Sequence, residues 1–295
     1  MDLVEAHKIP LGRWLEHGID ALDANAAWLF DLISDVLGGA IDGLIDLLMW
    51  FEPLVLVLLF ALLAWLLHRS VVLTVSIAAS LLLIVNLGLW EETIETLALV
   101  VFATVICMSV GVPLGILSAH RPWLHAVLRP VLDLMQTIPT FVYLIPTLIL
   151  FGLGVVPGLI STVVFALPAP IRLTHLGIAS VPRPLIEAGE AFGASRLQRL
   201  VKIELPSAAP SIMAGLTQCI MLSLSMVVIA ALVGADGLGK PVVRALNTVD
   251  IASGFEAGLA IVILAILLDR ICKPRRRTVP VRAAGPVTGR PARDR

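Results

Sequence analysis

Charge is scarce in this sequence. Asp, Glu, Lys and Arg make up 15% of the 295 residues, whereas soluble domains carry about 25%. Hydrophobic residues reach 58%, so much of the chain must lie in lipid. The net charge of −1 argues against a basic surface for nucleic acid. The sequence therefore predicts a membrane protein that does not bind nucleic acid.

Ligands for a metal or a reactive centre are also few. The three cysteines, Cys107, Cys219 and Cys272, share no close spacing, so neither a disulfide framework nor a zinc site is expected. No metal-ligand cluster includes the histidines, and these lie outside the apolar runs or at their edges. They are His7, His17, His68, His120, His125 and His175. We expect no catalytic residue, no metal and no cofactor held by this chain.

The first 50 residues lack the basic start and short apolar run of a secretory signal. Between Ala21 and Trp50, apolar residues recur at helical spacing with acidic residues between them. The acidic residues are Asp31, Asp35, Asp42 and Asp46. This pattern predicts an amphipathic helix on a membrane face or a partner; a soluble helical hairpin is the alternative. We assign residues 1–52 to this acidic extension.

Seven apolar stretches follow within residues 53–271, and a membrane-spanning helix needs about 20 apolar residues. The predicted fold is therefore all-α and polytopic, with about seven transmembrane helices, of which the first and last are short. The stretches are Pro53–Leu67, Val71–Leu89, Leu97–Ser118, Val131–Phe151, Val155–Ile171, Ala208–Val233 and Ala257–Leu268.

The distribution of Lys and Arg predicts the orientation. With the N-terminus outside and seven crossings, only Lys8, Arg13, Lys240 and Arg244 of the 21 cations fall outside. The positive-inside rule then places the C-terminus in the cytoplasm. Residues 1–52 are extracytoplasmic in this orientation, and the basic tail, residues 272–295, is expected to be disordered beside anionic lipid.

Ionisable residues are nearly missing from the spans themselves. Ion-coupled carriers usually keep such residues inside the bilayer, and Asp133 is the one clear example here, where a capping or interface role is the simpler interpretation. Residues 234–241 match G-x-x-x-x-G-K, but Pro241 stands where a nucleotide site needs Ser or Thr. Energy for any transport must come from elsewhere, unless the pore is passive.

The polar segment 183–206 is the longest loop between two spans. Two short helical stretches are separated by Gly193, and Pro206 is expected to open the next membrane helix, where its missing N–H costs least. The apolar residues of the loop can form one face. These are Ala188, Ala191, Leu197, Leu200 and Val201. A docking element and a self-packed connector both fit this pattern.

This loop resembles the E-A-A-x3-G-x9-I-x-L-P signature of membrane subunits of binding-protein-dependent ABC importers. Gly189 replaces the second alanine, which loosens the helix slightly, and the other fixed positions match. These are Glu187, Ala188, Gly193, Ile203, Leu205 and Pro206. The resemblance implies that the loop is a coupling helix, docked on a cytoplasmic ATPase subunit that binds the ATP. Glu187 would cap the helix or pair with the ATPase, and Arg196, Arg199 and Lys202 are either partner contacts or positive-inside charges.

Residues 132–146, 224–239 and 268–270 resemble glycine betaine/proline permeases. That resemblance implies a homodimeric bacterial inner-membrane permease for glycine betaine, proline betaine or a related solute, working with two ATPase subunits and an external substrate-binding protein. Choline, carnitine, methionine or taurine are alternative substrates within the same architecture. An ATP-independent channel or a structural membrane protein is the alternative from a different class.

The candidate substrate pathway is the proline-broken fourth span, because irregular backbone at membrane depth is tolerated where it lines a cavity or is buried in protein. Tyr143, the only tyrosine, and Phe141 could contact a quaternary ammonium by cation–π attraction, although helix packing is the alternative role for both. Gly111 and Gly115 form a G-x-x-x-G that allows close helix contact. The remaining pathway candidates are Gln136, Thr137, Pro139, Ser223, Ser225 and Met226.

Overall fold

A computed structural model describes residues 11–272, and over this range the regular structure is helical, without a strand. The predicted all-α class is confirmed. Residues 1–10 and nearly all of the predicted basic tail lie outside the described residues. The helices are α2 (Leu11–Met49), α3 (Pro53–His68), α4 (Val71–Asn86), α5 (Trp90–His120), α6 (Pro122–Thr137), α7 (Thr140–Phe151), α8 (Val155–Ala166), α9 (Pro168–Ala179), α10 (Arg183–Ala191), α11 (Arg196–Arg199), η1 (Leu200–Glu204), α12 (Leu205–Ala230), η2 (Ala231–Val233), α13 (Gly239–Thr248) and α14 (Ile251–Cys272).

Four helical segments of the described chain are long and apolar enough to cross a membrane singly. They are α5, Val155–Ala179, Arg196–Val233 and α14. Two sharply bent pairs, α2 with α3 and α6 with α7, raise the number to six if each pair crosses once, and α4 is a shorter apolar helix. The positions of the seven predicted stretches therefore agree with the helices, although fewer than seven are long enough alone.

The fourth predicted span is two helices rather than one. α6 and α7 meet at an angle of 97°, and the bend falls at Ile138 and Pro139. Ile138 is extended, with φ −66° and ψ 130°, because the ring of a following proline excludes the helical region. The predicted break at Pro139 is confirmed, and the continuous span Val131–Phe151 is corrected to a bent pair.

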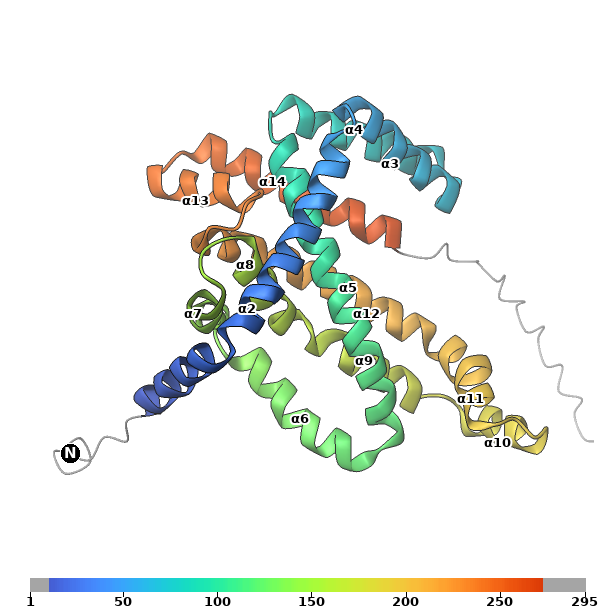
Figure 1. Ribbon diagram of the computed structural model, residues 1–295. Helices are drawn as coiled ribbons and strands as arrows, with labels where there is room; N and C mark the ends of the chain where they lie inside the picture. The colour runs from blue at the N-terminus through green and yellow to red at the C-terminus, as the bar shows by residue number, and fades with distance from the viewer. Residues whose placement is uncertain (1–10, 273–295) are drawn as a thin grey trace, which may run out of the picture.

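The centre of the molecule is a close packing of α5, α9 and α12. A Cβ atom on Gly111 would lie 2.8 Å from Pro170 Cγ, and one on Gly115 would lie 2.8 Å from the carbonyl oxygen of Ile171. Both glycines therefore let the backbone of α9 approach α5, which confirms the prediction from the G-x-x-x-G spacing. α5 runs from the end of the molecule that holds α3 and α4 to the opposite end (Figure 1).

The expected N-terminal amphipathic helix is present as α2. The four aspartates between Asp31 and Asp46 are exposed, whereas Ile41 is fully buried in a cluster with Ala98, Ala103 and Leu159. The rings of Phe30 and Phe151 lie edge to face, 5.3 Å apart. α2 thus packs its apolar side against α5, α7 and α8, and its start lies toward the end of the molecule that holds α6, α10 and α11 (Figure 1).

Candidate functional site

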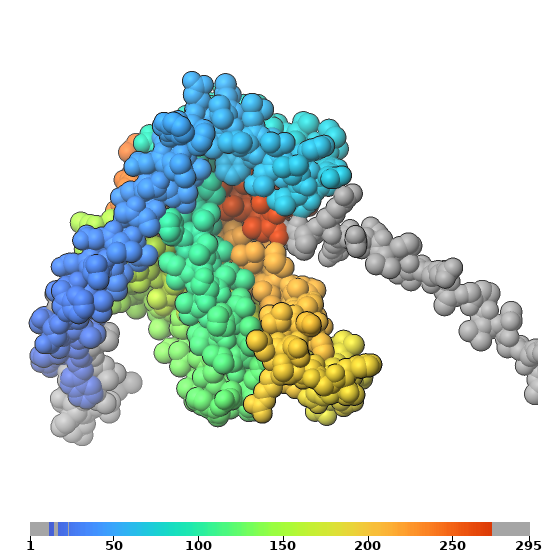
Figure 2. Space-filling view, turned by 45° about the vertical axis from the view of Figure 1, so that its right-hand side comes forward, coloured from blue at the N-terminus to red at the C-terminus, as the bar shows by residue number. Residues whose placement is uncertain are grey.

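Residues 183–204 form a helical hairpin, which we call the α10–α11 hairpin. It projects from the end of the molecule where α12 begins, as the yellow group in Figure 2 shows. Gly193 makes the turn with φ +75°, a conformation that glycine adopts without steric cost. The helix after the turn starts with a capping box, in which Ser195 and Gln198 each accept a hydrogen bond from the other's backbone N–H.

Pro206 lies in the first turn of α12, as expected, but α12 does not begin after a break in the chain. The chain is helical from Arg196 to Val233. A proline ring clashes with the carbonyl four residues earlier in an α-helix, and here the preceding residues Leu200–Glu204 are wound as a wider π-helix. The N–H of Leu205 accordingly donates to the oxygen of Leu200. The hairpin is therefore joined to α12 without a flexible break.

The hairpin carries a large exposed apolar surface. Phe192 at the turn is 93% exposed and Leu197 is 70% exposed, with Leu185 and Val201 also exposed. Of the apolar face predicted from the sequence, Ala188 and Ala191 are exposed and Leu200 is half-buried. Phe192 was missed, and the signal that could have found it was an aromatic residue beside the turn glycine. Exposed apolar patches of this kind mark interaction sites.

Gly189 serves the internal packing of the hairpin. Cδ1 of Ile203 lies so close that a Cβ on Gly189 would be 2.3 Å from it. Ile203 therefore packs on the backbone of α10, and the two arms of the hairpin are held together at this point. Glu187, Arg196 and Lys202 are exposed, and within the described chain none of them forms an ion pair.

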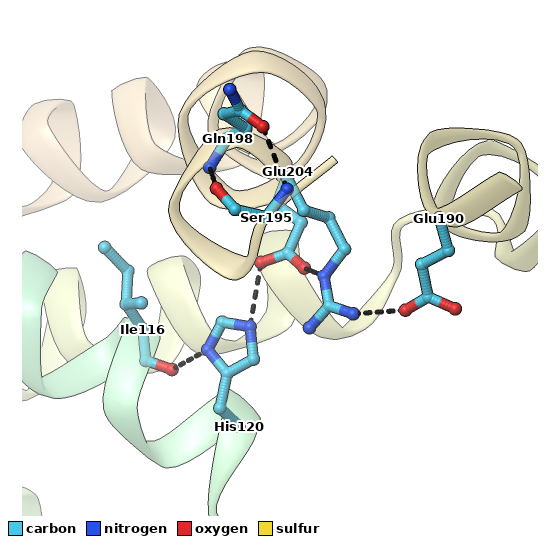
Figure 3. Close-up of polar contacts among 7 residues, drawn as sticks. Ile116, His120, Glu190, Ser195, Gln198 and Glu204 are labelled. Carbon is cyan, nitrogen blue, oxygen red and sulfur yellow. Dashed lines mark hydrogen bonds and ion pairs between the residues drawn. The ribbon is translucent and has the colours of Figure 1, made fainter. Parts of the chain in front are cut away.

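A chain of four hydrogen-bonded side chains, from His120 through Glu204 and Arg199 to Glu190, lies at the base of the hairpin (Figure 3). Glu204 is only 3% exposed and its two oxygens lie 2.8 Å from Nε2 of His120 and 2.9 Å from Nε of Arg199. Nη1 of Arg199 donates to Glu190 on α10 over 2.5 Å. Sequence reasoning gave Glu204, Glu190 and His120 no role. Arg199 and Glu204 are five residues apart, a spacing at which a π-helix brings two side chains together. Nothing in the sequence links either residue to His120.

The pathway candidates divide into exposed and buried groups. Gln136, Thr137, Pro139 and Phe141 are exposed around the α6–α7 bend, and Ser225 is exposed on α12, whereas Ser223 and Met226 are fully buried.

The hydroxyl of Tyr143 donates to the carbonyl of Met135 over 2.5 Å. Because that hydrogen bond spans the bend, Tyr143 fixes the angle between α6 and α7. Gln136, Pro139 and Phe141 are thus exposed on either side of the bend, whereas Ser223 and Met226 are buried.

The glycine-rich segment 234–241 packs against α5 instead of forming a phosphate-binding loop. The N–H of Leu238 donates to Oγ1 of Thr96 over 2.8 Å, and a Cβ on Gly239 would lie 2.3 Å from the carbonyl oxygen of Val227. Lys240 pairs with Asp236. Gly237 and Gly239 therefore serve close packing.

A pocket of about 270 Å³ lies between α5, α6 and α9. Asp133, the single charged residue noted within the predicted spans, forms an ion pair with Arg172 over 2.7 Å there. The rings of His125 and His175 are stacked with centroids 4.0 Å apart, and Nδ1 of His175 lies 3.0 Å from Oγ of Ser118. Asp133 therefore has an interface role.

Comparison with known proteins gives a consistent result. Residues 111–272 match the family described as binding-protein-dependent transport system inner membrane component. The chain is 45% identical to the glycine betaine transport system permease protein OpuAB of Bacillus subtilis, over 90% of this chain and 93% of that protein. It is 44% identical to the glycine betaine/proline betaine transport system permease protein ProW of Escherichia coli, over 89% of this chain and 74% of that protein.

Two further comparisons extend this result. The glycine betaine/carnitine transport permease protein GbuB of Listeria monocytogenes is 42% identical over 89% of this chain and 94% of that protein. Among solved structures, an inward-facing conformation of the MetNI methionine ABC transporter superposes with a TM-score of 0.55 and 26% identity. That match covers 60% of this chain and 91% of the MetNI chain.

Proposed function

This chain belongs to the family of binding-protein-dependent transport system inner membrane components, and from that membership we propose that it is the membrane-spanning subunit of an ATP-driven importer. The substrate we propose is glycine betaine, proline betaine or a related quaternary ammonium compound. Relatives at 42–45% identity that carry these substrates in their names support this choice.

The α10–α11 hairpin carries the proposal that ATP hydrolysis takes place in a partner. Its exposed Phe192 and Leu197 offer an apolar surface for an ATPase subunit. Because the helix continues from the hairpin into α12, movement of the docked subunit would be passed on to α12. Closure of the ATPase pair on ATP would move the hairpin and with it α9 and α12. ATP shifts the pathway between inward- and outward-facing states only by its difference in affinity for the two. This chain catalyses no bond chemistry itself.

The assembly we propose is a homodimer with two cytoplasmic ATPase subunits and an external substrate-binding protein. The hairpin lies in the cytoplasm, consistent with its cations Arg183, Arg196, Arg199 and Lys202. The N-terminal extension, residues 1–52, is placed outside and residues 272–295 inside, with 53–271 as the permease domain.

The pathway we propose passes the α6–α7 bend, where exposed Gln136, Thr137, Pro139 and Phe141 gather. Ser225 on α12 is a second polar exposed position. Contact between Phe141 or Tyr143 and a quaternary ammonium would be worth about 0.5–2 kcal/mol.

Uptake of radiolabelled glycine betaine tests the proposed function. Cells that lack their own betaine transporters would express this chain with its candidate ATPase and binding protein, with excess choline, carnitine or methionine as competitors. We expect uptake that requires all three proteins, stops on ATP depletion and survives excess methionine. Uptake without the ATPase would indicate a channel, and a stable complex with the ATPase that imports no betaine would leave an importer for another solute.

A further inference from the structure

The α10–α11 hairpin is connected to the transmembrane helices in two ways. Its second arm continues directly into α12, and its first arm is joined to the end of α9 by residues 180–182. α5, the long helix that packs on both α9 and α12, is far from the hairpin in sequence. His120, the last residue of α5, nevertheless reaches Glu204 at the base of the hairpin, as Figure 3 shows.

Both ring nitrogens of His120 have a hydrogen-bond partner. Nδ1 lies 3.0 Å from the carbonyl oxygen of Ile116 and Nε2 lies 2.8 Å from a carboxylate oxygen of Glu204. A carbonyl oxygen and a carboxylate oxygen both accept hydrogen bonds, so each ring nitrogen of His120 faces an acceptor, and a hydrogen bond to the Glu204 carboxylate is charge-assisted. Such charge-assisted hydrogen bonds are about twice as strong as neutral ones.

The surroundings of Glu204 make this contact hard to replace by water. The carboxylate is 3% exposed, with His120 on one side and Arg199 on the other, and Arg199 in turn binds Glu190 on α10. Removing one partner of a buried pair leaves an uncompensated charge. The four residues therefore link α10, the π-helical turn and the end of α5.

From this geometry we infer that His120 and Glu204 transmit movement of the hairpin to α5, as positioning residues of the import cycle. The inference rests on the proposed function, in which the hairpin binds an ATPase. Arg199 and Glu190 hold the Glu204 carboxylate in place. Without the contact, the ATPase would still bind and hydrolyse ATP, but α5 would no longer follow the hairpin.

The test measures substrate imported per ATP hydrolysed by the complete complex in proteoliposomes. For His120→Ala we expect this ratio to fall about fivefold or more, within the usual range of coupling between sites, while ATP hydrolysis and co-purification of the ATPase remain. His120→Gln keeps an N–H donor for Glu204 and should recover much of the ratio. Arg121→Gln is the matched control, because Arg121 is the next residue, is exposed and forms no ion pair in the described chain.

A double-mutant cycle makes the result specific to the pair. Glu204→Ala also removes the ion pair with Arg199, so the double variant with His120→Ala should lower the ratio no further than Glu204→Ala alone, because the contact with His120 is then already absent. An unchanged ratio in His120→Ala, additive losses in the double variant, or loss of the ATPase from the purified complex would each overturn the transmission role. If the wild-type complex itself imports nothing, it is the proposed function that fails.

Discussion

At the scale of single residues, the turn of the hairpin depends on one backbone conformation. Gly193 has φ +75° and nothing within 4 Å of the position of a Cβ. A substitution there is therefore limited by the backbone and not by space. A β-branched residue with a positive φ is strained, at a cost of about 1–3 kcal/mol.

We expect Gly193→Val to distort the hairpin and uncouple ATP hydrolysis from uptake while membrane insertion stays normal. The measurement is the rate of both processes in the same membrane vesicles. Gly43→Val on α2 is the control outside the hairpin, because Gly43 is helical without a positive φ and a Cβ there meets nothing within 4 Å. Full coupling in Gly193→Val would contradict the role of the turn.

Phe192 is the residue on which we expect binding of the ATPase to depend most. Aromatic side chains dominate binding energy at interfaces, with losses of about 2 kcal/mol or more on truncation to alanine. Phe192→Ala should therefore raise the Kd for the ATPase by about 30-fold, as measured by titration with the purified ATPase. Leu246→Ala on α13 is a matched control, since Leu246 is an apolar residue with 77% exposure at a distance from the hairpin. Equal affinity of the two variants would place the docking surface elsewhere.

At the scale of helices, the close contact of α5 with α9 is the feature most sensitive to substitution. A Cβ on Gly115 would lie 2.8 Å from the carbonyl oxygen of Ile171, and 2.6 Å from Cβ of Thr174. Neither atom can move without its helix. Gly115→Ala should thus lower the stability of the purified protein by about 1–3 kcal/mol, measured as thermal unfolding in detergent.

The control for that change is Gly258→Ala on α14, where a Cβ meets nothing within 4 Å. Alanine favours a helix over glycine by about 0.5–1 kcal/mol, so Gly258→Ala should leave the unfolding temperature unchanged or raise it. If both variants behave alike, the closeness of α5 and α9 does not determine stability.

The elements show which features a sequence can predict. The break at Pro139 and the turn at Gly193 were predicted, because each follows from the steric properties of one residue. The π-helical turn before Pro206 was not predicted, since either a new helix or a widened turn relieves the proline. The contact between His120 and Glu204 joins residues 84 positions apart, and it depends on how α5 and α12 pack, which no local pattern encodes.

At the scale of the whole molecule, the orientation in the membrane is the main open prediction. The cations predict an external N-terminus, while α2 lies beside α5 with its start toward the end that holds the hairpin. If α2 crosses the bilayer beside α5, its start lies on the cytoplasmic side. The two arrangements place Arg13 on opposite faces.

Labelling of single cysteines with a membrane-impermeant maleimide distinguishes the two arrangements of the N-terminus. In a Cys272→Ser background, where Cys107 and Cys219 are buried, we expect Arg13→Cys and Asn247→Cys to react in intact spheroplasts. Arg183→Cys on the hairpin should react only after permeabilisation. If Arg13→Cys behaves like Arg183→Cys, then residues 1–52 are not extracytoplasmic and α2 is a crossing helix.

The unbroken helix from Arg196 to Val233 has a consequence for how the two faces of the membrane communicate. Its 38 residues span about 57 Å at 1.5 Å per residue, from the hairpin to the glycine-rich turn whose Leu238 is bonded to Thr96. Coupling between two binding sites is reciprocal. If ATP at one end of this helix alters the affinity for a loaded binding protein at the other, then that binding protein must alter the affinity for ATP by the same factor.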